Sequence, residues 1–150
     1  PNLSDSGLHR AKVSRLPSTT YCEAPLRSLA MPQSYWAFTH SVAGYADVMD
    51  WWDKAVDGKN VNLYSGLGLY MSVSGGNYSW GVQPYEISNQ ILYTTKLKNV
   101  KGVSIYSMLS LKQVDRSSSQ IGHLGLMRVK NEYWTNTVAT PKTAAHQYLN

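Results

Sequence analysis

Hydrophobic positions along the chain group into short apolar runs that alternate with amphipathic segments. The run Leu29-Ala30-Met31 is closed by Pro32, which predicts a buried strand ending in a turn. A second strand is predicted over residues 61–70, where apolar residues occupy one face and two glycines on the other face allow close backbone approach. The apolar content of residues 102–111 predicts a third strand.

Helices are predicted between these strands. Ser41 can cap the first helix, and Asp57-Gly58 can end it. A loop over residues 71–83 follows the second strand, and Pro84 opens a second helix that extends to about Lys98. The last forty residues are predicted to be rich in loops, with a short helix after Pro141. The stripe that indicates the first helix consists of Val42, Tyr45, Met49, Trp52 and Val56.

This alternation predicts an α/β fold with parallel strands joined by right-handed crossovers. The repeat of roughly 35 to 40 residues is close to the ~31 residues per unit of an eightfold barrel. On this interpretation the chain has an irregular N-terminal arm, 1–28, and residues 29–150 form about three of the eight βα units of a TIM (β/α)8 barrel. An open three-stranded parallel sheet is the alternative.

Composition predicts a folded domain without a membrane span. Of 150 residues 43% are hydrophobic and 15% are charged, which is enough apolar material for one core. No apolar run approaches the ~20 residues that cross a bilayer. The net charge of +5 comes from dispersed residues, so we expect no nucleic-acid partner.

Cofactor and metal sites are not predicted. Cys22 is the only cysteine, which excludes an intrachain disulfide and a cysteine-based metal site. The four histidines, including His40, lack the spacing of known metal motifs. The pair Gly66 and Gly68 lacks the third glycine and helix start of a phosphate-binding loop, so nucleotide binding is disfavoured.

Four blocks of residues occur in order across roughly residues 29–111 and resemble a known family. That family is the bacterial glycoside hydrolase-like proteins with a family 10-like (β/α)8 barrel, and the resemblance is to their C-terminal barrel portion. The blocks are Met31-Pro32-Gln33-Ser34-Tyr35-Trp36 followed by Tyr45 and Trp51-Trp52; Leu63-Tyr64-Ser65-Gly66 with Tyr70; Trp80, Pro84, Glu86-Ile87 and Gln90-Ile91; and Val100-Lys101-Gly102-Val103 leading to Tyr106-Ser107.

The resemblance implies a carbohydrate-active barrel that bacteria secrete or display at the cell surface. Cell-wall or other extracellular oligosaccharides and polysaccharides are the implied substrates. The rest of the barrel would come from the same or another chain, and the complete barrel would hydrolyse O-glycosyl bonds. A non-catalytic carbohydrate-binding or cell-surface protein on the same fold is the alternative.

Glycoside hydrolysis usually needs two carboxylates, and barrel active sites lie after the carboxyl ends of the strands. This placement leaves Glu86 after the second strand and Asp115 after the third. Glu86 is the candidate catalytic residue. Its place in a first helical turn also fits simple stabilisation by the helix dipole, and Asp115 fits a solvated surface position.

Aromatic residues give the candidate glycan-binding surface. The chain has eleven Tyr and five Trp but one Phe, and Tyr and Trp suit half-wet surfaces such as sugar-binding clefts. Flat rings at the barrel mouth can stack on sugar rings, while Gln33 forms hydrogen bonds with sugar hydroxyls. Alternatively, Trp36 and Tyr70 could fill the top of the barrel as core residues. The predicted substrate-binding residues are Gln33, Tyr35, Trp36, Tyr70 and Trp80.

Overall fold

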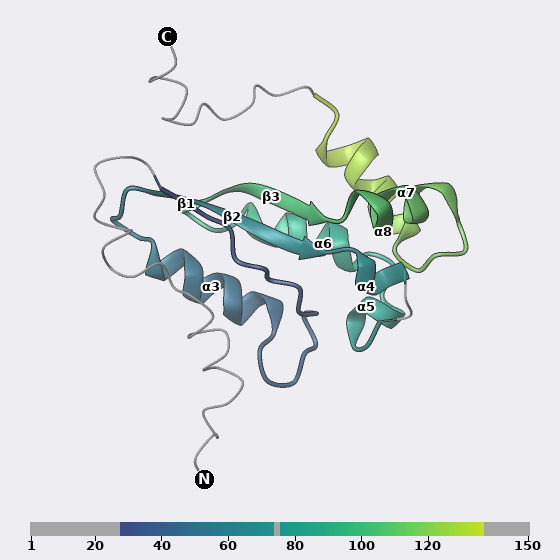
Figure 1. Ribbon diagram of the computed structural model, residues 1–150, viewed down its shortest axis with the longest axis horizontal. Coiled ribbons are helices and arrows are strands. Elements are labelled where there is room, and N and C mark those ends of the chain that lie inside the picture. Colours follow the sequence, from purple (N-terminus) through teal and green to yellow (C-terminus); the bar gives the residue numbers. More distant parts are fainter. Residues whose placement is uncertain (1–27, 74–75, 137–150) are drawn as a thin grey trace.

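A three-stranded parallel sheet forms the centre of the computed structural model, which describes residues 28–73 and 76–136 (Figure 1). The strands are β1 (Ser28–Ala30), β2 (Val61–Gly68) and β3 (Val100–Tyr106), in the order β1-β2-β3. Ala30 lies opposite Leu63, and Gly68 lies opposite Tyr106. The predicted parallel α/β arrangement is therefore confirmed. Of the predicted arm, 1–28, Ser28 belongs to β1 and residues 1–27 lie outside the described residues.

Two helices connect the strands and lie on one face of the sheet. Helix α3 (Tyr45–Ala55) joins β1 to β2, and α6 (Glu86–Thr94) joins β2 to β3. Both contact β2 and each other, as expected for successive crossover helices that return over the same face of a parallel sheet. Their apolar stripes pack on one side of β2, and the fully buried residues of this core include Tyr45, Met49, Leu63, Leu67 and Ile87.

On the opposite face of the sheet, several described side chains are exposed to solvent. Leu29 and Met31 point away from the two helices and are 56% and 50% exposed, and Tyr106 at the end of β3 is 57% exposed. Successive strands with their helices on one side are what consecutive βα units produce, and this arrangement is compatible with a portion of a barrel.

The first helix begins later than Ser41, which is a correction to the sequence prediction. Gly44 is the residue before the helix, and Ser41 makes no capping bond there. Nδ1 of His40 instead accepts hydrogen bonds from the backbone N–H groups of Val42 (3.3 Å) and Ala43 (3.1 Å). The His40 side chain, rather than the predicted cap Ser41, thus provides the acceptor for these amides, and residues 41–44 form a loop before the helix.

The predicted loop over 71–83 contains two short helices, α4 (Tyr70–Val73) and α5 (Ser79–Val82). The third strand ends at Tyr106 rather than at residue 111, because Met108 and Leu109 belong to helix α7 (Met108–Arg116) and are mostly exposed. A short apolar run has no periodicity that distinguishes a strand from a helix, so the sequence pattern could not predict where β3 ends and α7 begins.

Helices also replace much of the predicted loop-rich C-terminal part. Helix α8 (His123–Arg128) continues into the π-helical turn η1 (Val129–Tyr133) and packs on α6. Gly125 permits this approach, because its N–H donates to the Pro84 carbonyl at 2.9 Å and an added Cβ would lie 2.6 Å from the same oxygen. The helix predicted after Pro141 lies outside the described residues.

Two carboxylates of α3 contact the segment that follows β2. Asp50 Oδ1 accepts a 2.6 Å hydrogen bond from the hydroxyl of Tyr93, and Asp53 Oδ1 accepts one from the backbone N–H of Asn99 at 2.7 Å. Burial, together with Asp50, raises the pKa of Tyr93 to about 12. These bonds attach α6 and its C-terminal turn to α3.

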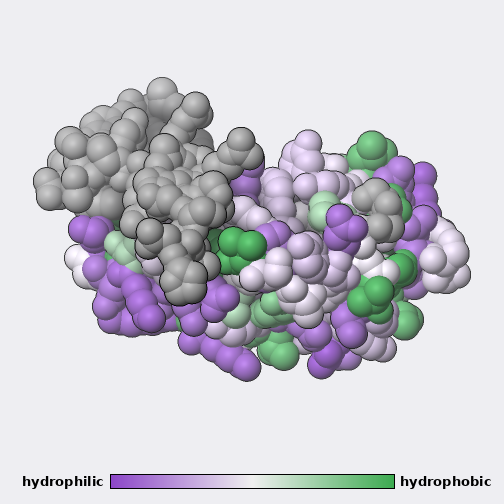
Figure 2. All heavy atoms as spheres, turned by 90° about the horizontal axis from the view of Figure 1, so that it is seen from below, coloured by the Kyte–Doolittle hydropathy of each residue, from purple (hydrophilic) through white to green (hydrophobic). Residues whose placement is uncertain are grey.

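Exposed apolar side chains are distributed over the surface. Seen from below the view of Figure 1, hydrophobic residues form several separate patches among hydrophilic ones (Figure 2). Scattered residues of this kind are normal for a folded protein. Within the described ranges no helix combines the length and the apolar character that a membrane crossing requires.

Candidate glycan-binding site

Three tyrosine rings meet at the carboxyl end of the sheet. Tyr35 follows β1, Tyr70 follows β2 and Tyr106 ends β3. The Tyr35 ring centroid lies 5.8 Å from that of Tyr70 and 5.7 Å from that of Tyr106, and the Tyr70 and Tyr106 centroids are 5.9 Å apart. Each strand thus contributes one aromatic ring to a single cluster, which we call the tyrosine cluster.

Glycines on β2 bring the segment after β1 into this cluster. An added Cβ at Gly66 would lie 2.7 Å from the Pro32 carbonyl oxygen, and one at Gly68 would lie 2.9 Å from the Tyr35 Cβ. The Tyr35 side chain therefore covers the bare backbone of Gly68. Gln33 pairs with Gly66 in an isolated parallel bridge and has an exposed side chain. The predicted close backbone approach on this face is confirmed.

The Tyr35 phenol sits in a partly desolvated position. Burial raises its pKa above the ordinary value, and the nearby Tyr106 and Tyr70 act in the same direction. The phenol therefore keeps its proton at neutral pH and can donate a hydrogen bond to a ligand oxygen. Because Tyr70 and Tyr106 are 36% and 57% exposed, the cluster presents aromatic surface to solvent.

Buried side chains hold the backbone that carries Tyr35. Nε1 of Trp80 donates to the Tyr35 carbonyl at 2.9 Å, and Nε2 of Gln90 donates to the Trp36 carbonyl at 3.0 Å. Trp80, predicted to contact substrate, is only 1% exposed and packs in the core beneath this segment. Trp36 is half-buried. Of the five predicted binding residues, the structure brings Tyr35 and Tyr70 into ring contact.

The Glu86 carboxylate is buried at the start of α6. It is 3% exposed, and its Oε1 accepts hydrogen bonds of 2.9 Å from the Phe38 backbone N–H and from Nε2 of Gln90. Its position in the first turn of α6 agrees with the helix-start interpretation. These contacts position the segment after β1, and a catalytic role for Glu86 stays a prediction.

Asp115, the other candidate carboxylate, lies near the end of α7. Its Oδ1 accepts a 2.7 Å hydrogen bond from the Lys130 ammonium group. This contact lowers the pKa of Asp115, which therefore stays ionised near neutrality. Its exposed ion pair agrees with the predicted surface position.

Tyr106 is the member of the tyrosine cluster that sequence analysis did not select. Its position in the sequence could have identified it, because Tyr106 lies at the carboxyl end of the third strand, as Tyr35 and Tyr70 follow the first two strands. Because the third strand was predicted to end at residue 111, Tyr106 was not recognised as a residue at the end of a strand.

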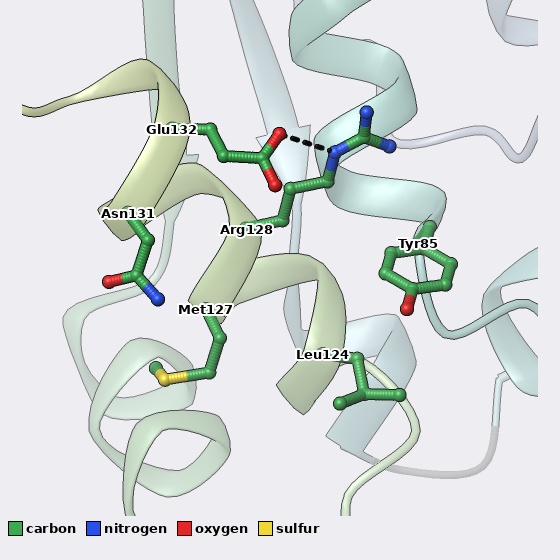
Figure 3. Close-up of a pocket in the computed structure, with 6 residues that line it drawn as sticks. All are labelled: Tyr85, Leu124, Met127, Arg128, Asn131 and Glu132. Carbon is green, nitrogen blue, oxygen red and sulfur yellow. Dashed lines mark hydrogen bonds and ion pairs between the residues drawn. The ribbon is translucent and has the colours of Figure 1, made fainter.

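A separate hollow of about 380 Å³ lies between the start of α6 and the last helix (Figure 3). Within it, Nε of Arg128 donates to Glu132 at 3.0 Å, and the guanidinium carbon is 6.0 Å from the centre of the Tyr85 ring. The hollow holds one carboxylate, so by itself it lacks the acid and base of a glycosidase. Its lining residues are Tyr85, Leu124, Met127, Arg128, Asn131 and Glu132.

Metal-ligating side chains do not gather in the part of the chain that the structure describes. No group of three or more His, Cys, Asp or Glu residues in these ranges could hold a metal ion.

Comparison with known proteins finds a relative that is named as a glycosyl hydrolase. The chain is 32% identical over 82 residues to the protein named Glycosyl hydrolase YngK of Bacillus subtilis (strain 168). The matched segment covers 55% of this chain and 16% of that protein, so the chain spans about a sixth of the relative's length. No protein-family model matches. The similarity supports a glycoside hydrolase-like relationship.

Proposed function

We propose that this chain is the C-terminal part of a glycoside hydrolase-like (β/α)8 barrel and that its tyrosine cluster binds glycan. The observation that carries the proposal is the meeting of Tyr35, Tyr70 and Tyr106 at the carboxyl end of three successive parallel strands. Active sites of (β/α)8 barrels lie at that end, and exposed rings with nearby polar groups suit sugar faces and hydroxyls.

The proposed ligands are oligosaccharides or polysaccharides of the bacterial cell wall or other extracellular glycans, met outside the cell or at its surface. Tyr35 and Tyr106 would stack on sugar rings, while Gln33 and the tyrosine hydroxyls would bond sugar hydroxyls. The exposed Leu29 and Met31 on the sheet face opposite the helices support a further proposal, that the remaining strands of the barrel enclose this face.

A non-catalytic carbohydrate-binding role is the second candidate function. The contacts of the two candidate carboxylates support it. Glu86 is buried and accepts two hydrogen bonds, and Asp115 is paired with Lys130. Neither arrangement leaves an unengaged acid and base in this segment. On this alternative the chain keeps the aromatic surface and binds sugars without cleaving them.

Calorimetric titration of the chain with soluble cell-wall glycan fragments tests the proposed binding. Replacing Tyr35 or Tyr106 by Ala should weaken binding roughly tenfold, the loss expected for one well-placed aromatic contact. Tyr85→Ala is the matched control, since Tyr85 is also partly exposed but lies outside the cluster. Equal affinity of all variants would refute the site.

Reducing-end release by the full-length protein that contains this chain separates the two candidates. Turnover that is lost with the Tyr35 and Tyr106 variants supports the hydrolase. Retained affinity with no turnover on any fragment supports the binding protein.

A further inference from the structure

We infer that His40 and Tyr78 form a second carbohydrate contact, separate from the tyrosine cluster. In this contact the Tyr78 ring supplies a stacking surface and the Nε2–H group of His40 supplies a hydrogen-bond donor. The inference rests on the proposed function, which gives the class of ligand. It adds a subsite built from the two connections that follow β1 and β2.

The two residues come from different connections and touch through their rings. His40 lies between β1 and α3, and Tyr78 immediately precedes α5. Their ring centroids are 4.8 Å apart with an interplanar angle of 54°, and the Ser41 hydroxyl lies 3.5 Å from the Tyr78 hydroxyl. Because Tyr78 is 46% exposed, much of its ring stays available to a ligand while His40 supports it.

Hydrogen bonds fix the tautomer that His40 presents. Its Nδ1 accepts from the backbone N–H groups of Val42 and Ala43, so the proton of the neutral ring lies on Nε2. A ring held in this way offers its Nε2–H to a ligand oxygen at a defined place.

The backbone of Tyr78 is held in a conformation that favours glycine. Its φ of 59° and ψ of −148° place a residue that carries a Cβ in a strained region. Neighbouring bonds maintain this shape, since the Ser79 N–H donates to Oγ1 of Thr39 at 2.8 Å and the Gly81 N–H donates to the Tyr78 carbonyl at 3.1 Å. Strained residues that their surroundings hold in place are typical of ligand clamps.

Sugars match the groups that this pair displays. The apolar face of a pyranose ring suits the exposed tyrosine ring, and its hydroxyls can accept from Nε2–H and exchange hydrogen bonds with the hydroxyls of Tyr78 and Ser41. The tyrosine cluster would bind sugars through the same kinds of contact, ring stacking and hydrogen bonds, so one glycan could occupy both the cluster and this subsite.

Proton NMR titration of the chain with N-acetylglucosamine oligomers of increasing length tests the inference. We expect the ring signals of His40 and Tyr78 to shift with the longer oligomers. Tyr78→Gly should weaken binding of these oligomers by about threefold to tenfold. The variant should fold, because glycine suits this backbone. Tyr78→Phe keeps the ring and should lose less affinity, and Tyr85→Ala is the exposed-tyrosine control.

The outcomes distinguish this subsite from the proposed central site. Shifts at Tyr35 without shifts at His40 and Tyr78, and with unchanged affinity of Tyr78→Gly, would overturn the subsite and leave the central site standing. Shifts at His40 and Tyr78 without shifts at Tyr35 would support the subsite and overturn the central one. If no oligomer of any length shifts any of these rings, both proposals fail.

Discussion

The buried carboxylate of Glu86 accepts a 2.9 Å hydrogen bond from the backbone N–H of Phe38, 48 residues earlier in the chain. The same oxygen accepts a bond from Gln90, whose amide also donates to the Trp36 carbonyl. This relationship joins α6 to the segment that carries Tyr35. A residue selected as a candidate catalyst is therefore also a support of the candidate binding site.

We expect Glu86→Ala to destabilise the chain by about 2–3 kcal/mol, because it leaves the partly buried Phe38 N–H and part of the buried Gln90 amide without an acceptor. Urea denaturation measures the loss. Glu132→Ala is the control, since that carboxylate forms an exposed pair with Arg128 and should change stability by less than about 1 kcal/mol. Equal effects of the two substitutions would contradict the positioning role.

Glu86→Gln separates positioning from catalysis. The amide oxygen of glutamine can still accept the Phe38 N–H, but it cannot exchange a proton or act as a nucleophile. If Glu86 only positions, Glu86→Gln should leave most of the glycan turnover proposed above intact. A loss of roughly a hundredfold or more, the usual scale of removing an acid–base catalyst, would instead identify Glu86 as catalytic.

Gly68→Ala should impair glycan binding by displacing Tyr35, because the added Cβ would lie 2.9 Å from the Tyr35 Cβ. We expect a stability loss of about 1–3 kcal/mol from this overpacking and a weaker calorimetric affinity for glycan fragments. The matched control is Gly58→Ala. Gly58 has a φ of 71° and no atom near its added Cβ, so the control should lose about 1 kcal/mol of stability and no affinity.

The fold of this chain was largely readable from its periodicities. The alternation in β2 and the stripe of Tyr45, Met49 and Trp52 have the periods of a strand and a helix that face one core, and both proved correct. Element ends were less accurate. Met108 and Leu109 continue the apolar run of the third strand, although they belong to helix α7. Where such a run changes from strand to helix depends on tertiary packing, and a few residues show too little periodicity to predict it.

The candidate site was predictable only where topology determined position. Tyr35 and Tyr70 follow strands whose carboxyl ends must share one edge, so their meeting follows from parallel pairing. Trp80 shows the limit, because the sequence gives no sign that its indole N–H reaches the Tyr35 carbonyl and so faces the core. Long-range hydrogen bonds of this kind depend on three-dimensional placement.

Trp80→Phe tests this buried placement. Losing the indole donor leaves the Tyr35 carbonyl without its partner and leaves a cavity, so we expect a destabilisation of about 1–3 kcal/mol in thermal or urea unfolding. Trp134→Phe is the control, because Trp134 is 48% exposed and its substitution should change stability by less than about 0.5 kcal/mol. Unchanged stability of Trp80→Phe combined with reduced glycan affinity would instead place Trp80 in the binding surface.

The Tyr93 hydroxyl, which donates to Asp50, should make stability depend on alkaline pH. Folding raises the pKa of Tyr93 from about 10 to about 12, so between these values the folded chain holds a proton that the unfolded chain has lost. Its contribution to stability is therefore fully present below pH 10 and declines as the pH rises to about 12. Tyr93→Phe should lose stability at neutral pH, and its difference from the parent chain should shrink over that range. A constant difference for Tyr93→Phe would mean that the bond to Asp50 does not couple folding to this proton.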